Sequence, residues 1–142
     1  MTVKQLSVFI ENRKGRLGEV LAVLREHRVN ILSMSLADTT EYGLLRLIVN
    51  RPEEGCRVLL DAGFSSMLTD VLIIKIPHVA GSLQETVTRI AAGDVNIEYL
   101  YGLSVEAEDA SIVMKTNEPE AACRVLREAG ISTMTPEEIS AL

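Results

Sequence analysis

PEEGCRVLLDAGFSSM, residues 52–67, returns in altered form as PEAACRVLREAGISTM, residues 119–134, with ten of the sixteen positions identical. Shifting the chain by 66 also places Gly15 on Gly81 and the V-N-I at 29–31 on the V-N-I at 95–97. A period this long suits one small compact domain better than a solenoid unit. The sequence therefore predicts a duplicated domain, with copies over residues 1–69 and 70–142.

The apolar residues of the first copy change period several times. Alternation at Leu6, Val8 and Ile10 predicts a strand, and the i, i+3, i+4, i+7 spacing from Leu17 predicts a helix to about Arg28. The remaining elements are strands over 29–37 and 44–50 around a turn at 39–43, a helix from Pro52 to a capping Gly63, and two short extended stretches within 64–76.

The second copy repeats this order. Its strands are predicted over 71–76, 95–103 and 110–116, its helices over 82–93 and 118–130, with a final short segment at 131–134. The fold class is therefore α+β, with two ferredoxin-like βαββαβ domains in tandem, each an antiparallel sheet with its helices on one face. The second strand is an edge in this topology, so joining the second strands of two copies would bury both edges.

Composition excludes several classes of protein. Of the 142 residues, 47% are hydrophobic and 24% charged, which is ordinary for a globular chain. A net charge of -6 argues against nucleic-acid binding, and no signal peptide or membrane span is visible. The two cysteines, Cys56 and Cys123, lie far apart with no metal-binding spacing. We expect a cytoplasmic protein with reduced thiols and neither metal nor cofactor.

The stretch ENRKGRLGEVL at 11–21 joins the first strand to the first helix, and Gly81 occupies the same junction in the second copy. A helix start leaves backbone N–H groups free and carries partial positive charge, so it favours a carboxylate or phosphate. Glycine permits a positive φ and the close approach of a ligand. Both loops are candidate small-anion sites; the alternative is that each glycine simply makes a turn.

The motif N-x-x-G-x-L at 12–17, followed by a helix and V-N-I at 29–31, resembles the ACT domain, a small ligand-binding regulatory module. The second copy carries H-V-A-G-S-L at 78–83 and V-N-I-E-Y-L-Y at 95–101, so the resemblance covers the whole chain as a tandem pair. The family usually has a Pro before the loop glycine, but this chain has Lys14 there in the first copy and Ala80 in the second. The resemblance implies that an amino acid binds where the loop of one copy meets the second strand of a neighbouring copy.

The ligand's carboxylate is expected at the loop N–H groups, and its ammonium at asparagine oxygens or strand carbonyls. For Asn30 and Asn96, turn chemistry is the alternative to ligand contact. Tyr99 and Tyr101 alternate on one strand and so point the same way, which predicts packing residues. The predicted ligand-binding residues are Asn12, Lys14, Gly15, Arg16, Leu17, Asn30, Ile31 and Ser33 in the first copy and His78, Val79, Ala80, Gly81, Ser82, Leu83, Asn96, Ile97 and Tyr99 in the second.

No catalytic motif is found, so the chain is predicted not to be an enzyme. Three functions remain open. The chain is a free-standing amino-acid sensor, a homodimer that joins four copies; or a regulatory subunit that docks on a separate biosynthetic enzyme, since SVFIENRKGRLGEVLAVL at 7–24 resembles the small regulatory subunit of acetolactate synthase; or a ligand-free dimerisation module. We favour the sensor.

Overall fold

A computed structural model describes residues 1–38 and 41–142. The chain divides into two compact units. The N-terminal unit consists of Lys4–Thr69 with Ile139–Leu142, and the C-terminal unit consists of Asp70–Glu138 with Met1–Val3. Each has the βαββαβ order that the repeat predicts, so the predicted α+β, ferredoxin-like fold class is confirmed.

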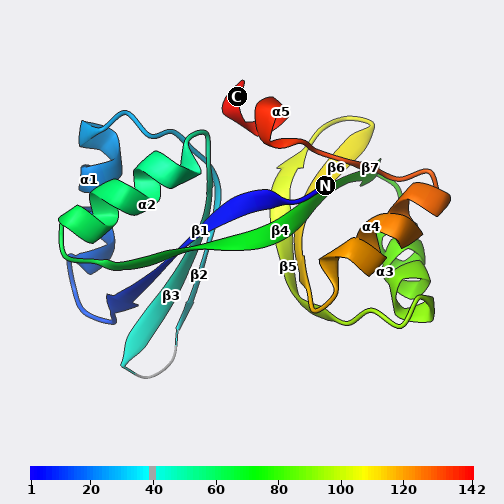
Figure 1. The fold of residues 1–142 in the computed structure, drawn as a ribbon, viewed down its shortest axis with the longest axis horizontal. Coiled ribbons are helices and arrows are strands. Elements are labelled where there is room, and N and C mark those ends of the chain that lie inside the picture. The colour runs from blue at the N-terminus through cyan, green and yellow to red at the C-terminus, as the bar shows by residue number, and fades with distance from the viewer. Residues whose placement is uncertain (39–40) are drawn as a thin grey trace. The chain divides into compact units, whose positions relative to one another are not determined.

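The N-terminal unit is a split βαβ arrangement with its helices on one side of the sheet (Figure 1). Strand β3 lies between β1 and β2 and is antiparallel to both, and the strand order is β2-β3-β1-β4. Its elements are β1 (Val3–Glu11), α1 (Arg16–Glu26), β2 (Ile31–Asp38), β3 (Tyr42–Val49), α2 (Pro52–Asp61) and the first part of β4 (Ser65–Pro77).

The core of this unit follows directly from the strand period. Because side chains alternate along a strand, β1 and β3 each direct one set of apolar residues towards α1 and α2. The helices pack their own apolar stripes, formed by residues at helical spacing, against these strand side chains. The buried set is Leu6, Val8, Ile10, Val20, Leu24, Val29, Leu45, Leu47, Val49, Val58, Leu59 and Phe64.

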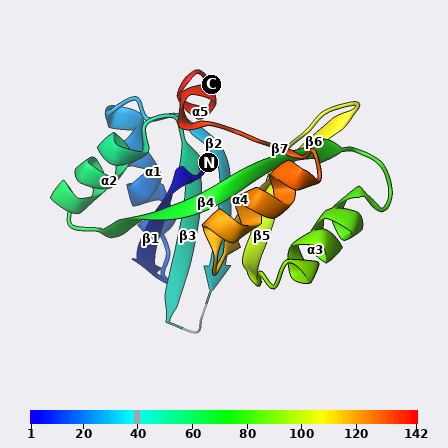
Figure 2. The ribbon, with the colours of Figure 1, turned by 45° about the vertical axis from the view of Figure 1, so that its right-hand side comes forward.

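The C-terminal unit repeats the arrangement with the second part of β4 as its first strand (Figure 2). Its strand order is β7-β4-β6-β5, with antiparallel pairing throughout. The further elements are α3 (Ser82–Ala92), β5 (Ile97–Val105), β6 (Asp109–Thr116), α4 (Pro119–Glu128) and β7 (Ser132–Thr133). Its core contains Leu72, Ile74, Ile76, Ile90, Val95, Ala110, Met114, Ala122 and Leu126.

Some element bounds differ from the predictions. The two extended stretches predicted within 64–76 form one continuous strand, and α1 ends at Glu26, where His27 caps it, rather than near Arg28. Helix α2 ends at Asp61 with Ala62 as its C-cap, and the predicted capping glycine, Gly63, follows with a left-handed φ of 90°. A short helix, α5 (Pro136–Ser140), was not predicted. The turn predicted over 39–43 falls partly on Thr39 and Thr40, which lie outside the described residues, and its Tyr42 and Gly43 belong to β3 instead, paired with the end of β1.

Candidate functional site

The β1–α1 and β4–α3 loops have nearly the same backbone. Gly15 has φ 90° and ψ −15°, and Gly81 has φ 93° and ψ −15°. Both residues stand at the N-cap position, and no side chain caps either helix. An added Cβ would meet nothing within 4 Å at either glycine, so the left-handed backbone, and not lack of space, is what calls for glycine there.

The two helix starts leave backbone donors without acceptors. Each glycine carbonyl accepts the first helical bond, from Glu19 N–H at 3.1 Å and from Glu85 N–H at 2.9 Å. Among the described residues no acceptor is found for the N–H groups of Leu17 and Leu83, which open the two helices just after each glycine. Unpaired donors at the positive end of a helix dipole suit a small anion.

The cations around Gly15 are largely engaged with neighbours. Arg13 Nε donates to Glu11 Oε2 at 2.7 Å, and this contact holds the pKa of the Glu11 carboxyl below its usual value. The Arg16 guanidinium lies 4.4 Å above the centre of the Phe64 ring and pairs with Glu19. Arg16 Nε is buried without a hydrogen-bond partner. Lys14 is exposed and has no ion-pair partner in the described part of the chain, so it is the cation available to a ligand.

The loop around Gly81 is neutral by contrast. His78, Val79 and Ala80 are all exposed, and His78 N–H donates to Glu108 O at 2.7 Å. Ser82 is half-buried, and its N–H donates to Val79 O at 3.2 Å. The two loops therefore share a backbone but differ in charge.

The second-strand residues are placed by a pair of asparagines that the sequence analysis missed. Asn30 N–H donates to Asn50 Oδ1 at 2.9 Å, and Asn50 N–H donates back to Asn30 O at 3.1 Å. Asn96 and Asn117 form the same two bonds at 2.9 and 3.1 Å. The signal was present, because Asn50 and Asn117 coincide when the repeat is aligned by 67.

The left-handed turn expected at Asn30 and Asn96 lies two residues earlier. Positive φ values occur at Arg28 (56°) and Asp94 (60°). Asn30 and Asn96 are exposed, and their backbones hold the second strand against the third. Their side chains have no hydrogen-bond partner among the described residues, so their amides are accessible to a ligand.

The other second-strand residues divide between core and sheet surface. Ile31 and Ile97 pack on the two cores. Ser33 and Tyr99 are half-buried and follow a shift of register at the same place in both copies. Tyr99 stacks on Tyr101, with ring centres 6.5 Å apart, as expected for alternate residues of one strand. Leu17 packs on the N-terminal core, whereas Leu83 is 36% exposed.

Within one unit the loop and the start of its own second strand do not meet. Asn12 N–H donates to Glu41 O beside the start of β3, whereas Asn30 bonds Asn50 just past the end of that strand. Helix α1 separates the two places along the chain, and its 11 residues span about 16 Å. A site that uses both sets of residues therefore requires a second copy of the domain.

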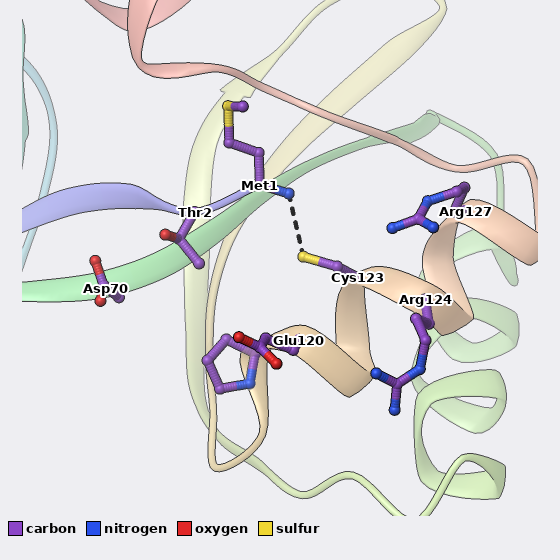
Figure 3. A pocket seen from close by; sticks show the side chains of 8 residues that line it. Met1, Thr2, Asp70, Glu120, Cys123, Arg124 and Arg127 are labelled. Atoms are coloured by element: carbon purple, nitrogen blue, oxygen red, sulfur yellow. Dashed lines mark hydrogen bonds between the residues drawn. The ribbon is translucent and has the colours of Figure 1, made fainter.

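One shallow pocket, of about 520 Å³, lies on α4 of the C-terminal unit (Figure 3). Met1 N donates to Cys123 Sγ at 3.2 Å in it, and Arg124 and Arg127 line it from the same helix. None of the predicted ligand residues contributes. A second pocket, of about 570 Å³, contains Asn96, Asn117 and Glu118.

In residues 1–38 and 41–142 no group of three or more His, Cys, Asp or Glu is placed to hold a metal ion. No helix of the described chain has the length and apolar character needed to cross a membrane.

Two ferredoxin-like units with matching glycine helix starts define a tandem pair of small α+β domains. The family model for an ACT domain pair matches residues 1–142, and the chain belongs to this family. Members are typically regulatory modules that bind small molecules. A search among curated proteins finds no match.

Solved structures show the same architecture. Protein BT0572 from Bacteroides thetaiotaomicron is 32% identical, with a TM-score of 0.94 over 100% of this chain and 98% of that one. The regulatory subunit of aspartate kinase from Thermus thermophilus, in a ligand-free form, is 19% identical, with a TM-score of 0.63 over 89% and 91%. The Thermus flavus regulatory subunit is 17% identical, with the same TM-score, over 89% and 92%.

Proposed function

We propose that this chain is a non-catalytic cytoplasmic regulator that binds an amino acid between ACT domains. The observation that carries the proposal is the duplicated helix start, with its left-handed glycine and no side-chain cap. The ligand's carboxylate takes the free N–H groups after Gly15 or Gly81, in charge-assisted hydrogen bonds. Lys14 adds a positive charge at the first loop, so that loop is the stronger anion site.

The ammonium group of the ligand needs hydrogen-bond acceptors. These are the side-chain oxygens of Asn12, Asn30 or Asn96, or second-strand carbonyls of a neighbouring copy. In the described chain β2 pairs with β3 and β5 pairs with β6, and neither has a second partner strand. A homodimer that joins such edges would bring a second strand to each loop. A ligand bound across that junction shifts the association equilibrium, because separating the domains removes half of the site.

Docking on a separate biosynthetic enzyme is the second candidate function. The resemblance of residues 7–24 to the acetolactate synthase small subunit and the likeness of the fold to aspartate kinase regulatory subunits favour it. A pull-down that recovers one enzyme stoichiometrically supports docking.

A thermal-shift screen of the purified chain against the twenty amino acids and common anions tests the sensor. A ligand at a hundredfold excess over its Kd adds about 2.7 kcal/mol to the folded state, which moves the midpoint by several degrees. We expect one or two amino acids to give such a shift while inorganic anions do not. If no amino acid shifts the unfolding midpoint, the sensor hypothesis is wrong, and docking on an enzyme or a ligand-free dimerisation module becomes the proposed function.

A further inference from the structure

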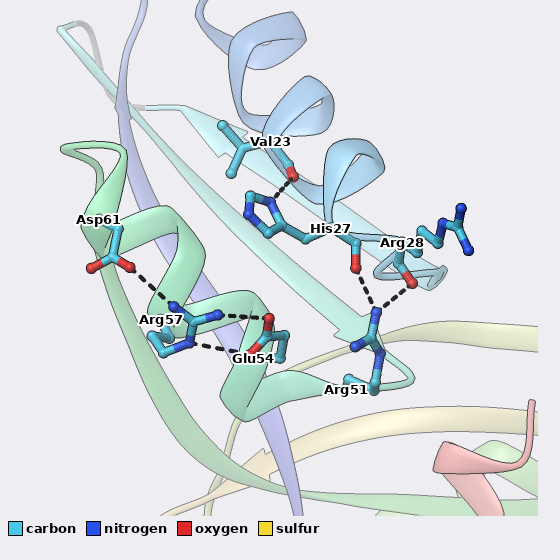
Figure 4. A network of polar contacts seen from close by, with 7 residues as sticks. All are labelled: Val23, His27, Arg28, Arg51, Glu54, Arg57 and Asp61. Atoms are coloured by element: carbon cyan, nitrogen blue, oxygen red, sulfur yellow. Dashed lines mark hydrogen bonds and ion pairs between the residues drawn. The ribbon is translucent and has the colours of Figure 1, made fainter.

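The C-terminal end of α1 is closed by an arginine from the start of α2 (Figure 4). Arg51 Nη2 donates to two consecutive carbonyl oxygens, His27 O at 2.6 Å and Arg28 O at 2.7 Å. A helix leaves its last carbonyls without intrahelical donors and carries partial negative charge there, so a guanidinium satisfies both needs.

The backbone that receives this guanidinium is repeated in the C-terminal unit. The φ of Asp94 is 60° where that of Arg28 is 56°. The residue before the next helix, Glu118, has φ −133° and ψ 76°, against −135° and 77° for Arg51. The asparagine pair that fixes the adjacent strands has the same two bond lengths in both units. We call each pair of carbonyl oxygens a carbonyl cradle: His27 O with Arg28 O in the N-terminal unit, and Gly93 O with Asp94 O in the C-terminal unit. The two cradles therefore have the same backbone conformation.

The side chains differ between the two cradles. In the repeat alignment Glu118 replaces Arg51, Gly93 replaces His27 and Ala121 replaces Glu54. Each change shortens the side chain or removes the donor that fills the cradle in the N-terminal unit. A pocket of about 570 Å³, lined among others by Gly93, Asp94, Asn96, Glu118 and Ala121, opens at this place.

The charge of the cradle is also reversed. Arg28 and Arg51 flank it in the N-terminal unit, whereas Asp94 and Glu118 flank it in the C-terminal unit. Across the described residues, Gly93 O and Asp94 O accept no hydrogen bond from another protein group. A cation placed there would meet two carbonyls, the negative end of α3 and two carboxylates.

We propose that this pocket binds a guanidinium group supplied from outside the unit, in the place that Arg51 fills in the N-terminal copy. A planar guanidinium can bond the two carbonyls and a carboxylate at once, whereas a compact, strongly hydrated ammonium loses more hydration for fewer bonds. The polar residues of the pocket, Asp94, Asn96 and Glu118, are exposed, so we expect a dissociation constant of about 1 mM. The proposal does not depend on amino-acid binding at the glycine loops.

Agmatine is a suitable probe, because it carries a guanidinium but no carboxylate that could occupy a loop site. In an NMR titration of the full chain we expect saturable shifts of the Gly93, Asp94, Asn96 and Glu118 amides. The His27 and Arg28 amides should not move, because Arg51 fills their cradle. Putrescine, with amines only, should bind at least about tenfold more weakly, a difference of about 1.4 kcal/mol.

Two substitutions at one position make the test specific. Glu118→Gln should weaken agmatine binding about tenfold. Glu118→Arg recreates the Arg51 arrangement and should abolish binding while the unit stays folded. Glu120→Gln, on the same helix but outside this pocket, is the matched control and should leave binding unchanged.

Sedimentation equilibrium identifies the source of the guanidinium. If the chain self-associates and both agmatine and Glu118→Arg weaken that association, an arginine of a second copy occupies the pocket; any other outcome identifies the occupant as a free guanidinium compound. The absence of saturable shifts at tens of millimolar agmatine, equal binding of putrescine, or unchanged binding in Glu118→Arg would each overturn the proposal.

Discussion

Gly15 and Gly81 hold a left-handed backbone with open space where a side chain would begin. Aspartate at either position therefore meets strain but no clash, and the strain costs about 1–2 kcal/mol. We expect Gly81→Asp to weaken amino-acid binding at that loop at least about tenfold, because its carboxylate competes for the same N–H groups and repels the ligand's own. Isothermal calorimetry with the amino acid found in the thermal-shift screen measures the effect.

Gly81→Asn is the matched control for this prediction. Asparagine has nearly the same shape and also tolerates the left-handed region, but it carries no charge, so it separates the effect of the carboxylate from that of backbone strain. Equal ligand affinity in the Asp and Asn variants would show that the carboxylate does not bind at Gly81. The variants Gly15→Asp and Gly15→Asn, compared by ligand affinity in the same way, test whether Lys14 compensates for the added negative charge.

The two loop glycines could be predicted from sequence because their signal is local: a strand period, a glycine and a helix period follow one another within a few residues. The role of Asn30 was not predicted, although the coincidence of Asn50 with Asn117 in the repeat was a signal for it. Its backbone is held by Asn50, 20 residues further on, and the two meet only after β2 and β3 have paired. The guanidinium closure by Arg51 is non-local in the same way, since its acceptors lie 23 and 24 residues earlier in the chain.

At the scale of elements, the predictions were good where a periodic pattern is long and poor where it is short. The extended character of residues 64–76 was predicted, but not that they form one strand, because periodicity alone does not count strands. The absence of a glycine or proline within this stretch was the signal for a single strand. Helix α5 was missed because it has only five residues. Its signal was a capping box: Thr135 and Glu138 exchange hydrogen bonds between side chain and backbone.

The contact between α3 and α4 depends on Gly93. A Cβ at this position would lie 2.5 Å from Val125 Cγ2, and the χ1 of a helical valine is stiff. We expect Gly93→Ala to destabilise the C-terminal unit by about 1–3 kcal/mol, the usual cost of overpacking. Amide hydrogen exchange measures this unit by unit, which a single unfolding midpoint does not.

Two further variants test the stated cause. In the double variant Gly93→Ala with Val125→Ala, removal of the clashing methyl group should recover most of the loss caused by the added one. Gly18→Ala, in α1, meets nothing within 4 Å and should instead stabilise the N-terminal unit by about 0.5–1 kcal/mol. A destabilised double variant with no favourable coupling would contradict the steric explanation.

At the scale of the whole molecule, each end of the chain groups with the unit made by the other half. Met1–Val3 group with Asp70–Glu138, and Ile139–Leu142 group with Lys4–Thr69. The repeat does not encode this grouping, because both end segments lie outside the stretches that align between the copies. Copies over 1–69 and 70–142 remain our proposed domains, and this grouping implies that a cut between them would leave each domain without a short segment.

Ile139 provides the test of this grouping. Its side chain is only 3% exposed, and truncation of a buried isoleucine to alanine costs about 2–5 kcal/mol. We expect Ile139→Ala to lower amide protection across Lys4–Thr69 while protection within Asp70–Glu138 changes little, although Ile139 directly follows Glu138 in the chain. Leu142→Ala, at a side chain that is 61% exposed, should leave both units unchanged. Loss of protection confined to Asp70–Glu138 would mean that the C-terminal segment stabilises its own half of the chain, and that the ends of the two copies are not exchanged.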